Sequence, residues 1–237
     1  YAVPTQSGEA LRELAGKPAL LQPRLAGKHV SQPNAHHCAE IGAWLARLHL
    51  ATREQILERR SDRGLDWMLE EGPVLALELH DEQLPLLRDS LHEVAELKAR
   101  ILALPRANLH ADLFIDNALF DGNQLAGVID FYNACSGPML YDLAITLNDW
   151  CSAADQRLDG PRAQALLGAY AALRPFTRAE AELWPAMLRI ACLRFWLSRL
   201  IAARRFQGRD VLVKDPGEFQ RRLAQRQQVA LALPFAF

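Results

Sequence analysis

Apolar residues recur at helical spacing along most of the chain. After Ser31, a candidate N-cap with Pro33 in the first turn, the pattern predicts a helix to about Leu50. A short helix is predicted around Trp67 and a long amphipathic one over 82–102. Further helices are predicted over 139–151, 161–172, 177–205 and from Pro216 to near Leu233. The pattern therefore favours a mostly helical body.

The first thirty residues have a different pattern. Two short runs with apolar residues, 11–14 and 19–21, flank the turn signal Gly16-Lys17-Pro18. They predict a small hairpin, and an isolated hairpin is marginally stable in water, so it is expected to need a sheet to join. The segment 22–27 then looks like a connector to the helical body.

A second hairpin is predicted in the middle of the chain, and polar residues surround it. Apolar 118–120, the turn Asp121-Gly122-Asn123 and apolar 125–129 predict two strands. Before them the stretch His110–Asn117 reads His-Ala-Asp-Leu-Phe-Ile-Asp-Asn, and after them comes Asp130. The hairpin is therefore expected to hold two acids and an asparagine around one site.

The spacing of these residues is that of a kinase catalytic loop. His110, Asp112 and Asn117 match H-x-D-x-x-x-x-N, in which the aspartate accepts the proton of the substrate hydroxyl and the asparagine holds Mg²⁺. Asp130 stands where the second metal-binding acid of Asp-Phe-Gly would be, but Tyr132 replaces the glycine. That departure fits the small-molecule relatives of protein kinases better than the protein kinases.

The residue types suit phosphoryl transfer. Mg²⁺ prefers oxygen ligands, so Asn117 and Asp130 are candidate metal ligands. The reaction depends on positioning and charge neutralisation, so Asp112 need only align the hydroxyl and accept its proton late. His110 is interpreted as structural, bonding the backbone within the loop. Asp142 is interpreted as bracing the loop from the following helix.

Residues that would bind the acceptor are less well defined. Asp149 and Trp150 either line the acceptor pocket or form a helix end with a buried tryptophan. Arg194 and Arg199 lie on the long predicted helix, where such residues usually form an amphipathic face. The alternative is that one of these arginines binds a substrate carboxylate.

Composition excludes several other classes of protein. The 237 residues are 50% hydrophobic and 23% charged, with a net charge of -1, so the clustered basic excess of a nucleic-acid or acidic-membrane binder is missing. No apolar run approaches the roughly 18 residues of a membrane span. The four cysteines form no CxxC pair and are expected to be buried, reduced thiols in the cytoplasm. The oligomeric state is left open.

Further motifs narrow the family. They are Pro33–Cys38, Arg63–Trp67, His110–Asp130, Ile145–Cys151, Leu193–Leu200 and Lys214–Pro216. With them, nearly the whole chain closely resembles the homoserine kinases of the aminoglycoside phosphotransferase and choline kinase superfamily. The resemblance implies an α+β, protein-kinase-like fold and phosphorylation of the L-homoserine hydroxyl with ATP and Mg²⁺, for threonine synthesis. It implies Asp112 as the catalytic base and Asn117 and Asp130 as metal ligands.

The resemblance also implies a nucleotide site. Residues 22–25 would be the hinge between two lobes, where Gln22, Arg24 and Leu25 offer backbone groups to adenine, since Pro23 has no N–H to donate. Leu119 and Ile129 would form the apolar floor under the base. The implied division is 1–24 for a remnant of the N-terminal nucleotide lobe with the hinge, and 25–237 for the catalytic lobe.

One departure from the family concerns the start of the chain. The family's N-terminal lobe supplies a phosphate-covering loop, a strand lysine and a glutamate, and neither Lys17 nor Lys28 fits the strand lysine. Because the chain opens at Tyr1 without an initiator methionine, its start is expected to be cut and its N-terminal lobe incomplete. We therefore expect this chain to bind ATP poorly and to turn over slowly.

Two alternatives remain open. One is a related kinase that acts on choline, an aminoglycoside or another small hydroxyl compound. Choline would need acids and aromatic residues in its pocket, whereas the carboxylate of homoserine would need an arginine or backbone donors. The other alternative is a non-catalytic, kinase-like protein, against which the presence of all three of Asp112, Asn117 and Asp130 argues.

Overall fold

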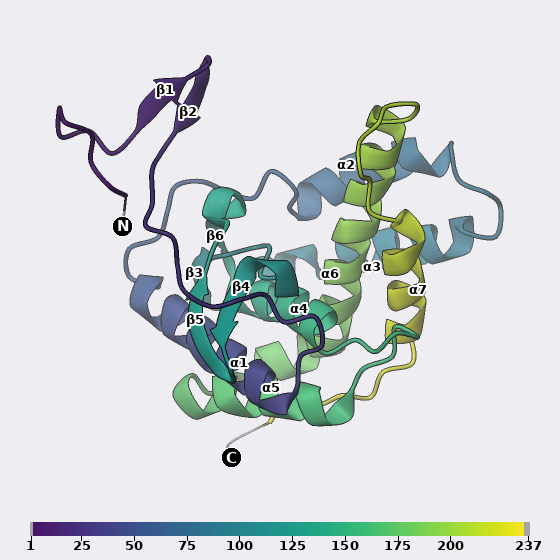
Figure 1. The fold of residues 1–237 in the computed structure, drawn as a ribbon. Helices are drawn as coiled ribbons and strands as arrows, with labels where there is room; N and C mark the ends of the chain where they lie inside the picture. The colour runs from purple at the N-terminus through teal and green to yellow at the C-terminus, as the bar shows by residue number, and fades with distance from the viewer. Residues whose placement is uncertain (1, 235–237) are drawn as a thin grey trace.

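The computed structural model describes residues 2–234, and it is largely helical (Figure 1). Residue 1, which belongs to the expected N-terminal lobe, and residues 235–237, which belong to the expected catalytic lobe, lie outside the described residues. The helices are α1 (Ala35–Thr52), α2 (Leu65–Ala76), α3 (Leu84–Leu102), α4 (Met139–Trp150), α5 (Gly160–Leu173), α6 (Arg178–Arg205) and α7 (Pro216–Arg226). The strands are β1 (Arg12–Leu14), β2 (Lys17–Ala19), β3 (Arg106–Leu109), β4 (Ala118–Asp121), β5 (Gln124–Val128) and β6 (Cys135–Pro138).

The strands form three antiparallel pairs, β1–β2, β3–β6 and β4–β5. The pair β4–β5 is the predicted central hairpin; its turn is Gly122-Asn123, and Asp121, which was expected in the turn, is the last residue of β4 and pairs with Gln124. The pair β3–β6 was not predicted from the sequence. Its register joins Arg106 to Pro138 and Leu109 to Cys135, so it pairs two segments on either side of the hairpin.

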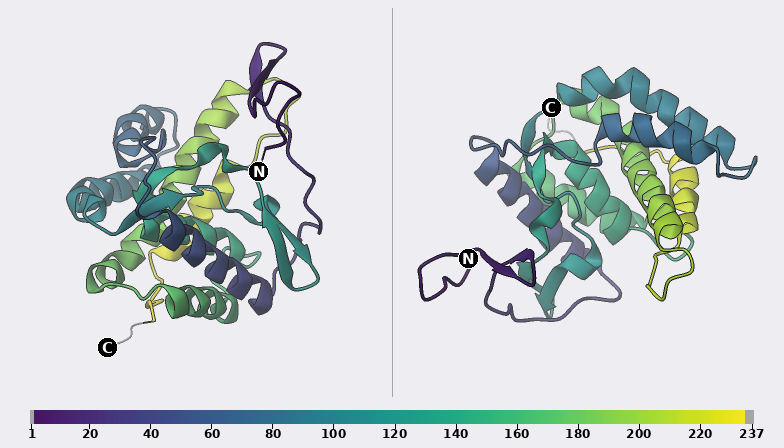
Figure 2. Two further views of the ribbon diagram at one scale, coloured as in Figure 1. Left: turned by 90° about the vertical axis from the view of Figure 1, so that its left-hand side faces the viewer. Right: turned by 90° about the horizontal axis from the view of Figure 1, so that it is seen from above.

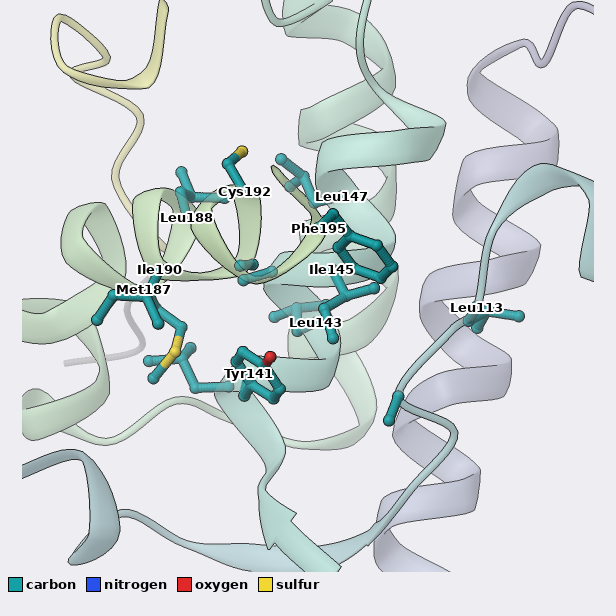
Figure 3. Packing of buried hydrophobic residues seen from close by; sticks show 14 of the residues in the cluster. Leu113, Tyr141, Leu143, Ile145, Leu147, Met187, Leu188, Ile190, Cys192 and Phe195 are labelled. Atoms are coloured by element: carbon teal, nitrogen blue, oxygen red, sulfur yellow. The ribbon is translucent and has the colours of Figure 1, made fainter. Parts of the chain in front are cut away.

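The hydrophobic core lies between the helices of the C-terminal part. Helix α6 packs against α4 and α7, and α1 packs against α5. Figure 3 shows side chains of α4, such as Leu143 and Leu147, and of α6, such as Leu188 and Phe195, in one buried cluster. Trp184 and Trp196 of α6 are also fully buried. Most residues of α6 from Leu183 to Leu197 are buried, as expected for the middle of a central helix.

Helix ends differ from the prediction in two places. The cap of α1 is Asn34, not Ser31: the Asn34 side chain accepts the N–H of His37 at 3.0 Å, and the Asn34 N–H donates to His37 Nδ1 at 3.1 Å. Helix α7 ends at Arg226, not near Leu233. The chain beyond it is not helical, yet Leu233 is buried against the core, so the apolar spacing there reflects packing of an irregular segment.

The β1–β2 hairpin lies at the outside of the molecule, on the opposite side from α2 and α3 (Figures 1 and 2). Its turn is Ala15-Gly16, both with positive φ, so Lys17 and Pro18 belong to the second strand and not to the turn. Leu14 and Leu21 are exposed, and among residues 2–234 no third strand pairs with this hairpin. Within the same residues, no helix combines the length and apolarity needed to span a bilayer.

Candidate active site

The loop between β3 and β4 is positioned by one buried carboxylate. Asp142 of α4 accepts the backbone N–H groups of His110 and Ala111, each at 2.8 Å. Ala111 has a φ of 62°, a left-handed conformation that an alanine adopts only where its surroundings impose it. The hydrogen bonds to Asp142 therefore hold a strained backbone next to Asp112.

Two residues that the sequence did not indicate complete this support. His49 of α1 contacts Asp142 Oδ2 through Nε2 at 3.2 Å, and its Nδ1 contacts the hydroxyl of Tyr170 of α5 at 2.8 Å. All three side chains are fully buried. Burial alone would raise the pKa of Asp142, but the hydrogen bond from His49, the charges of His49 and His110, and the bonds from the loop lower it below its ordinary value. Asp142 is therefore held as a carboxylate.

His110 connects the loop to the end of the hairpin. Its Nε2 donates to the carbonyl of Ile129 at 2.9 Å, and within residues 2–234 its buried Nδ1 has no hydrogen-bond partner. The next residue, Asp130, has a φ of 69°. The bond from His110 thus fixes the backbone immediately before a second left-handed residue, and such strain is concentrated at functional sites.

Asp112 is partly buried and contacts one donor closely. Its Oδ2 accepts from Asn133 Nδ2 at 3.0 Å, and its Oδ1 lies 3.7 Å from Arg194 Nη1. Burial raises the pKa of Asp112 above its ordinary value, although Arg194, His110 and Asn133 oppose the rise. A carboxylate with a raised pKa is a better proton acceptor than one in water. Asn133 was not identified from the sequence because nothing in its local pattern relates it to Asp112.

Asn117 and Asp130 line the same pocket as Asp112. Asn117 Nδ2 donates to the backbone carbonyl of Asp112 at 2.8 Å. Because a carbonyl only accepts, the amide orientation of Asn117 is fixed and its Oδ1 is left for another partner. Asp130 is exposed, and the N–H of Ile129 donates to the carbonyl of Asn117 at 3.0 Å, which links the two segments. An amide oxygen and a carboxylate fit a hard divalent cation.

The expected hinge and the expected floor face the same cleft. This cleft has a volume of about 1210 Å³, and its lining includes Gln22, Arg24 and Leu25 together with Leu119 and Ile129. Lys28 and Phe120 exchange backbone hydrogen bonds of 2.9 Å, which attach the segment after the hinge to β4. Asp130 and Tyr132 line both this cleft and the pocket of Asp112, so the two spaces adjoin.

The structure decides between the two interpretations of Trp150. Its side chain is 0% exposed, packs on Phe120 and donates through Nε1 to the carbonyl of Leu113 at 3.1 Å. It is a buried tryptophan at a helix end and is not among the residues that line the pocket of Asp112. Asp149 accepts the N–H of Ile115 at 2.8 Å and lies 3.8 Å from Arg222. It does not itself line the pocket of Asp112, although Phe114 and Asp116 on either side of Ile115 do.

The two candidate arginines have different surroundings. Arg199 Nη1 donates to the carbonyl of Asp215 at 2.9 Å and to Glu218 at 2.5 Å, so it joins α6 to the start of α7. Arg194 is 3% exposed, faces Asp112, and its guanidinium lies 3.7 Å from the ring centre of Phe195. Only Arg194 points a guanidinium at Asp112 without a closer carboxylate partner among the described residues.

Comparison with known proteins shows what the chain is similar to. The model of the family described as "Phosphotransferase enzyme family" matches residues 2–176. The homoserine kinase of Pseudomonas aeruginosa (strain UCBPP-PA14) is 68% identical over 236 residues, which cover 100% of this chain and 75% of that protein. The homoserine kinase of Methylobacillus flagellatus is 43% identical over 97% of this chain and 73% of its own length.

A solved structure has the same fold at low sequence identity. The choline/ethanolamine kinase family protein from Mesorhizobium loti superposes with a TM-score of 0.67 at 17% identity, over 92% of this chain and 73% of that one. At that identity the likeness concerns the fold alone. It confirms the α+β, kinase-like fold expected from the sequence.

Proposed function

The chain belongs to the phosphotransferase enzyme family and, within it, to the homoserine kinases; from that premise we propose that it transfers the γ-phosphate of ATP to the hydroxyl of L-homoserine. The observation that supports this most is the placement of Asp112. Its partly buried carboxylate lines a pocket together with Arg194, and Asp130 lines both this pocket and the adjoining cleft, which is large enough for a nucleotide. Asn117 lines the same pocket as Asp112.

Asp112 is the proposed base. In the reaction the homoserine oxygen bonds to the γ-phosphorus, the bond from that phosphorus to the bridging oxygen breaks, and ADP leaves. The hydroxyl proton passes to Asp112, whose raised pKa suits a late proton transfer. Asn133 and the loop bonds to Asp142 hold this carboxylate in position. Positioning is the larger part of catalysis for this reaction class.

Members of a kinase family use a nucleotide and a divalent cation, and we propose Mg²⁺ as that cation. Asn117 and Asp130 would hold it, and His110 and Asp142 would support the loop that carries them. When bound, the cation neutralises charge on the transferred phosphate. Gln22, Arg24 and Leu25 would bind adenine through their backbone groups above Leu119 and Ile129.

The proposal includes a division of the chain and a cellular place. Residues 1–24 would belong to the nucleotide lobe with its hinge and residues 25–237 to the catalytic lobe, which puts the nucleotide cleft at their boundary. We place the reaction in the cytoplasm. All four cysteines are buried free thiols, which suits a reducing compartment.

The test is a phosphate-acceptor screen with the purified protein. ³¹P NMR would follow ATP, Mg²⁺ and each of L-homoserine, choline and an aminoglycoside. We expect the phosphate ester to form on homoserine, and Asp112→Ala to lower the rate by about 100-fold or more. A phosphate ester on choline or the aminoglycoside in preference to homoserine would contradict the proposed substrate. Activity of Asp112→Ala within about tenfold of the parent would contradict the proposed base.

A further inference from the structure

Two polar groups on one face of α6 are buried without partners. Arg194 is 3% exposed, and its Nη1 makes no hydrogen bond within the part of the chain that the structure describes. The Oγ of Ser198, four residues later on the same helix, is also buried and unpaired there. Residues at this spacing lie on one helix face. Both line the pocket of Asp112, which has a volume of about 360 Å³.

Such groups are costly unless something pairs with them. A buried polar group without a hydrogen bond costs about 1–3 kcal/mol, and a charged one costs more. Native proteins therefore keep few of them. Two on adjacent turns of α6, both lining one open pocket, indicate that a ligand supplies the missing acceptors.

The nearest carboxylate does not satisfy Arg194. Asp112 Oδ1 lies 3.7 Å from Arg194 Nη1, which is beyond hydrogen-bond distance, and Asp112 Oδ2 is bonded to Asn133. The ring of Phe195, 3.7 Å from the guanidinium, fixes the orientation of Arg194. A second arginine, Arg63, lines the pocket from the segment before α2. The pocket lining therefore supplies cationic donors, from Arg63, Arg194, Arg199 and Lys214, alongside the acids Asp112, Asp116 and Asp130.

We propose that Arg194 and Ser198, with Arg63 beside them, form the subsite for the carboxylate of the acceptor. This selects an amino-acid alcohol over neutral or cationic alcohols. It rests on the proposed function, because it takes Asp112 as the group that aligns the acceptor hydroxyl. A planar guanidinium binds a carboxylate through two parallel N–H···O bonds, and the Ser198 hydroxyl can donate a further one. Arg199 suits this role less well because its Nη1 already donates to Asp215 and Glu218.

The dimensions of homoserine suit this arrangement. Four covalent bonds separate its hydroxyl oxygen from its carboxylate carbon, so an extended molecule spans about 5 Å between them. Arg194 Nη1 and Asp112 Oδ1 are 3.7 Å apart, and a ligand bonded to both adds a hydrogen bond of about 2.8 Å at each end. The two ends of the ligand can therefore be farther apart than the two protein atoms are. One molecule can therefore place its hydroxyl at Asp112 while its carboxylate contacts Arg194.

A competing explanation is that Arg194 acts only on Asp112 by orienting it. The two explanations differ in how the effect of a substitution depends on the acceptor. The test compares L-homoserine with L-homoserine amide, which replaces the carboxylate by a neutral group of similar shape. Calorimetry would measure the binding of each compound to the full chain and to Arg194→Gln, Arg194→Lys and Ser198→Ala. The matched control is Arg204→Gln, on the same helix but exposed and paired with Glu78.

We expect the parent to bind homoserine more tightly than the amide. Arg194→Gln should weaken homoserine binding by about 10- to 100-fold, because it removes hydrogen bonds between two charged groups, and should change amide binding by less than about threefold. Arg194→Lys should weaken homoserine binding less than Arg194→Gln does, since lysine keeps the positive charge but lacks the paired N–H donors of the guanidinium. Ser198→Ala should weaken homoserine binding by about 3- to 10-fold, and Arg204→Gln should bind as the parent does.

Equal weakening of both compounds by Arg194→Gln, or equal binding of both by the parent, would overturn the subsite. If Arg194→Gln does not fold, as judged by its melting curve, Arg194→Lys and Ser198→Ala decide the question in the same way. Phosphoryl transfer to each compound, measured in parallel, separates the two proposals. Selective binding of homoserine without a phosphate ester would end the proposed function and leave the subsite standing. Equal phosphorylation of homoserine and its amide would support the proposed function and contradict the carboxylate subsite.

Discussion

At the scale of single residues, the motif and its surroundings have different origins in the sequence. The spacing of His110, Asp112 and Asn117 is local, so the sequence could place them together. Their partners Asn133 and His49 come from distant segments, and no periodicity relates them to the loop. The sequence also could not show that Trp150 is buried, since a tryptophan at a helix end suits a pocket or a core equally.

Asn133 affects the proton affinity of the base. Its amide favours the charged form of Asp112, so Asn133→Ala should raise the pKa of Asp112 further above its ordinary value. Because the base acts when deprotonated, activity is present above that pKa and is lost as pH falls through it. We expect the acid limb of kcat/KM against pH to move to higher pH in Asn133→Ala. Replacement of the exposed Gln228 by alanine should leave the limb in place. An unmoved limb in Asn133→Ala would show that this amide does not set the pKa.

Asp142 contributes to the stability of the loop. Asp142→Asn places an amide N–H₂ or a weaker acceptor against two backbone N–H groups. We therefore expect it to lower the free energy of unfolding by about 2–4 kcal/mol. The pKa of Asp142 is lowered in the folded state, so its contribution is complete above the ordinary value of 3.8 and is lost as pH falls through the folded value. Urea unfolding at several pH values should show the difference between variant and parent shrinking in acid. The exposed Asp155 offers the control, since Asp155→Asn should change stability by under about 0.5 kcal/mol. A difference that persists unchanged in acid would contradict the assigned charge.

At the scale of elements, the helices were predicted well and the strand pair β3–β6 was missed. Helical periodicity extends over many residues, so α3 and α6 could be identified within a few residues of their ends. Each strand of β3–β6 has only four residues, and β6 contains Gly137 and Pro138, which are unfavourable in strands. Their pairing is set by tertiary contacts, and it matters because β3 leads directly into the catalytic loop.

Close packing of α1 on α5 depends on Gly42. A Cβ at this position would lie 2.2 Å from the carbonyl oxygen of Leu166, which belongs to the backbone of α5 and cannot move aside alone. We expect Gly42→Ala to destabilise the protein by about 1–3 kcal/mol through overpacking, although alanine favours helices. Gly168 of α5 is the matched control, because nothing lies within 4 Å of its added Cβ. Gly168→Ala should stabilise by up to about 1 kcal/mol, and thermal unfolding would compare the two. Stabilisation by both alanines would contradict the close contact.

At the scale of the whole molecule, the arrangement of the two spaces around Asp112 was beyond the sequence. The motif predicted which residues act on a phosphate, and the resemblance implied where adenine would bind. Neither could show that one pocket wall would be α6, with Arg194 and Ser198 lining the same pocket as Asp112. That wall depends on how α6 packs against α4 and α7, which is a property of the complete core.

Nucleotide binding in the cleft that Asp130 lines should stabilise the whole fold, by an amount that depends on the proposed metal site. A nucleotide present with Mg²⁺ at about a hundred times its Kd contributes about 2.7 kcal/mol to the folded state, which for a chain of this size raises Tm by about 5–10 °C. Because Asp130 is a proposed ligand of the cation, Asp130→Asn should lose the part of the shift that EDTA removes from the parent. Asp155→Asn removes an exposed carboxylate that lines neither the cleft nor the pocket of Asp112, so this variant should keep the full shift. Differential scanning calorimetry with ADP, with and without Mg²⁺, would measure each variant. A shift of equal size in the presence of EDTA would mean that Asn117 and Asp130 hold no cation that the nucleotide uses.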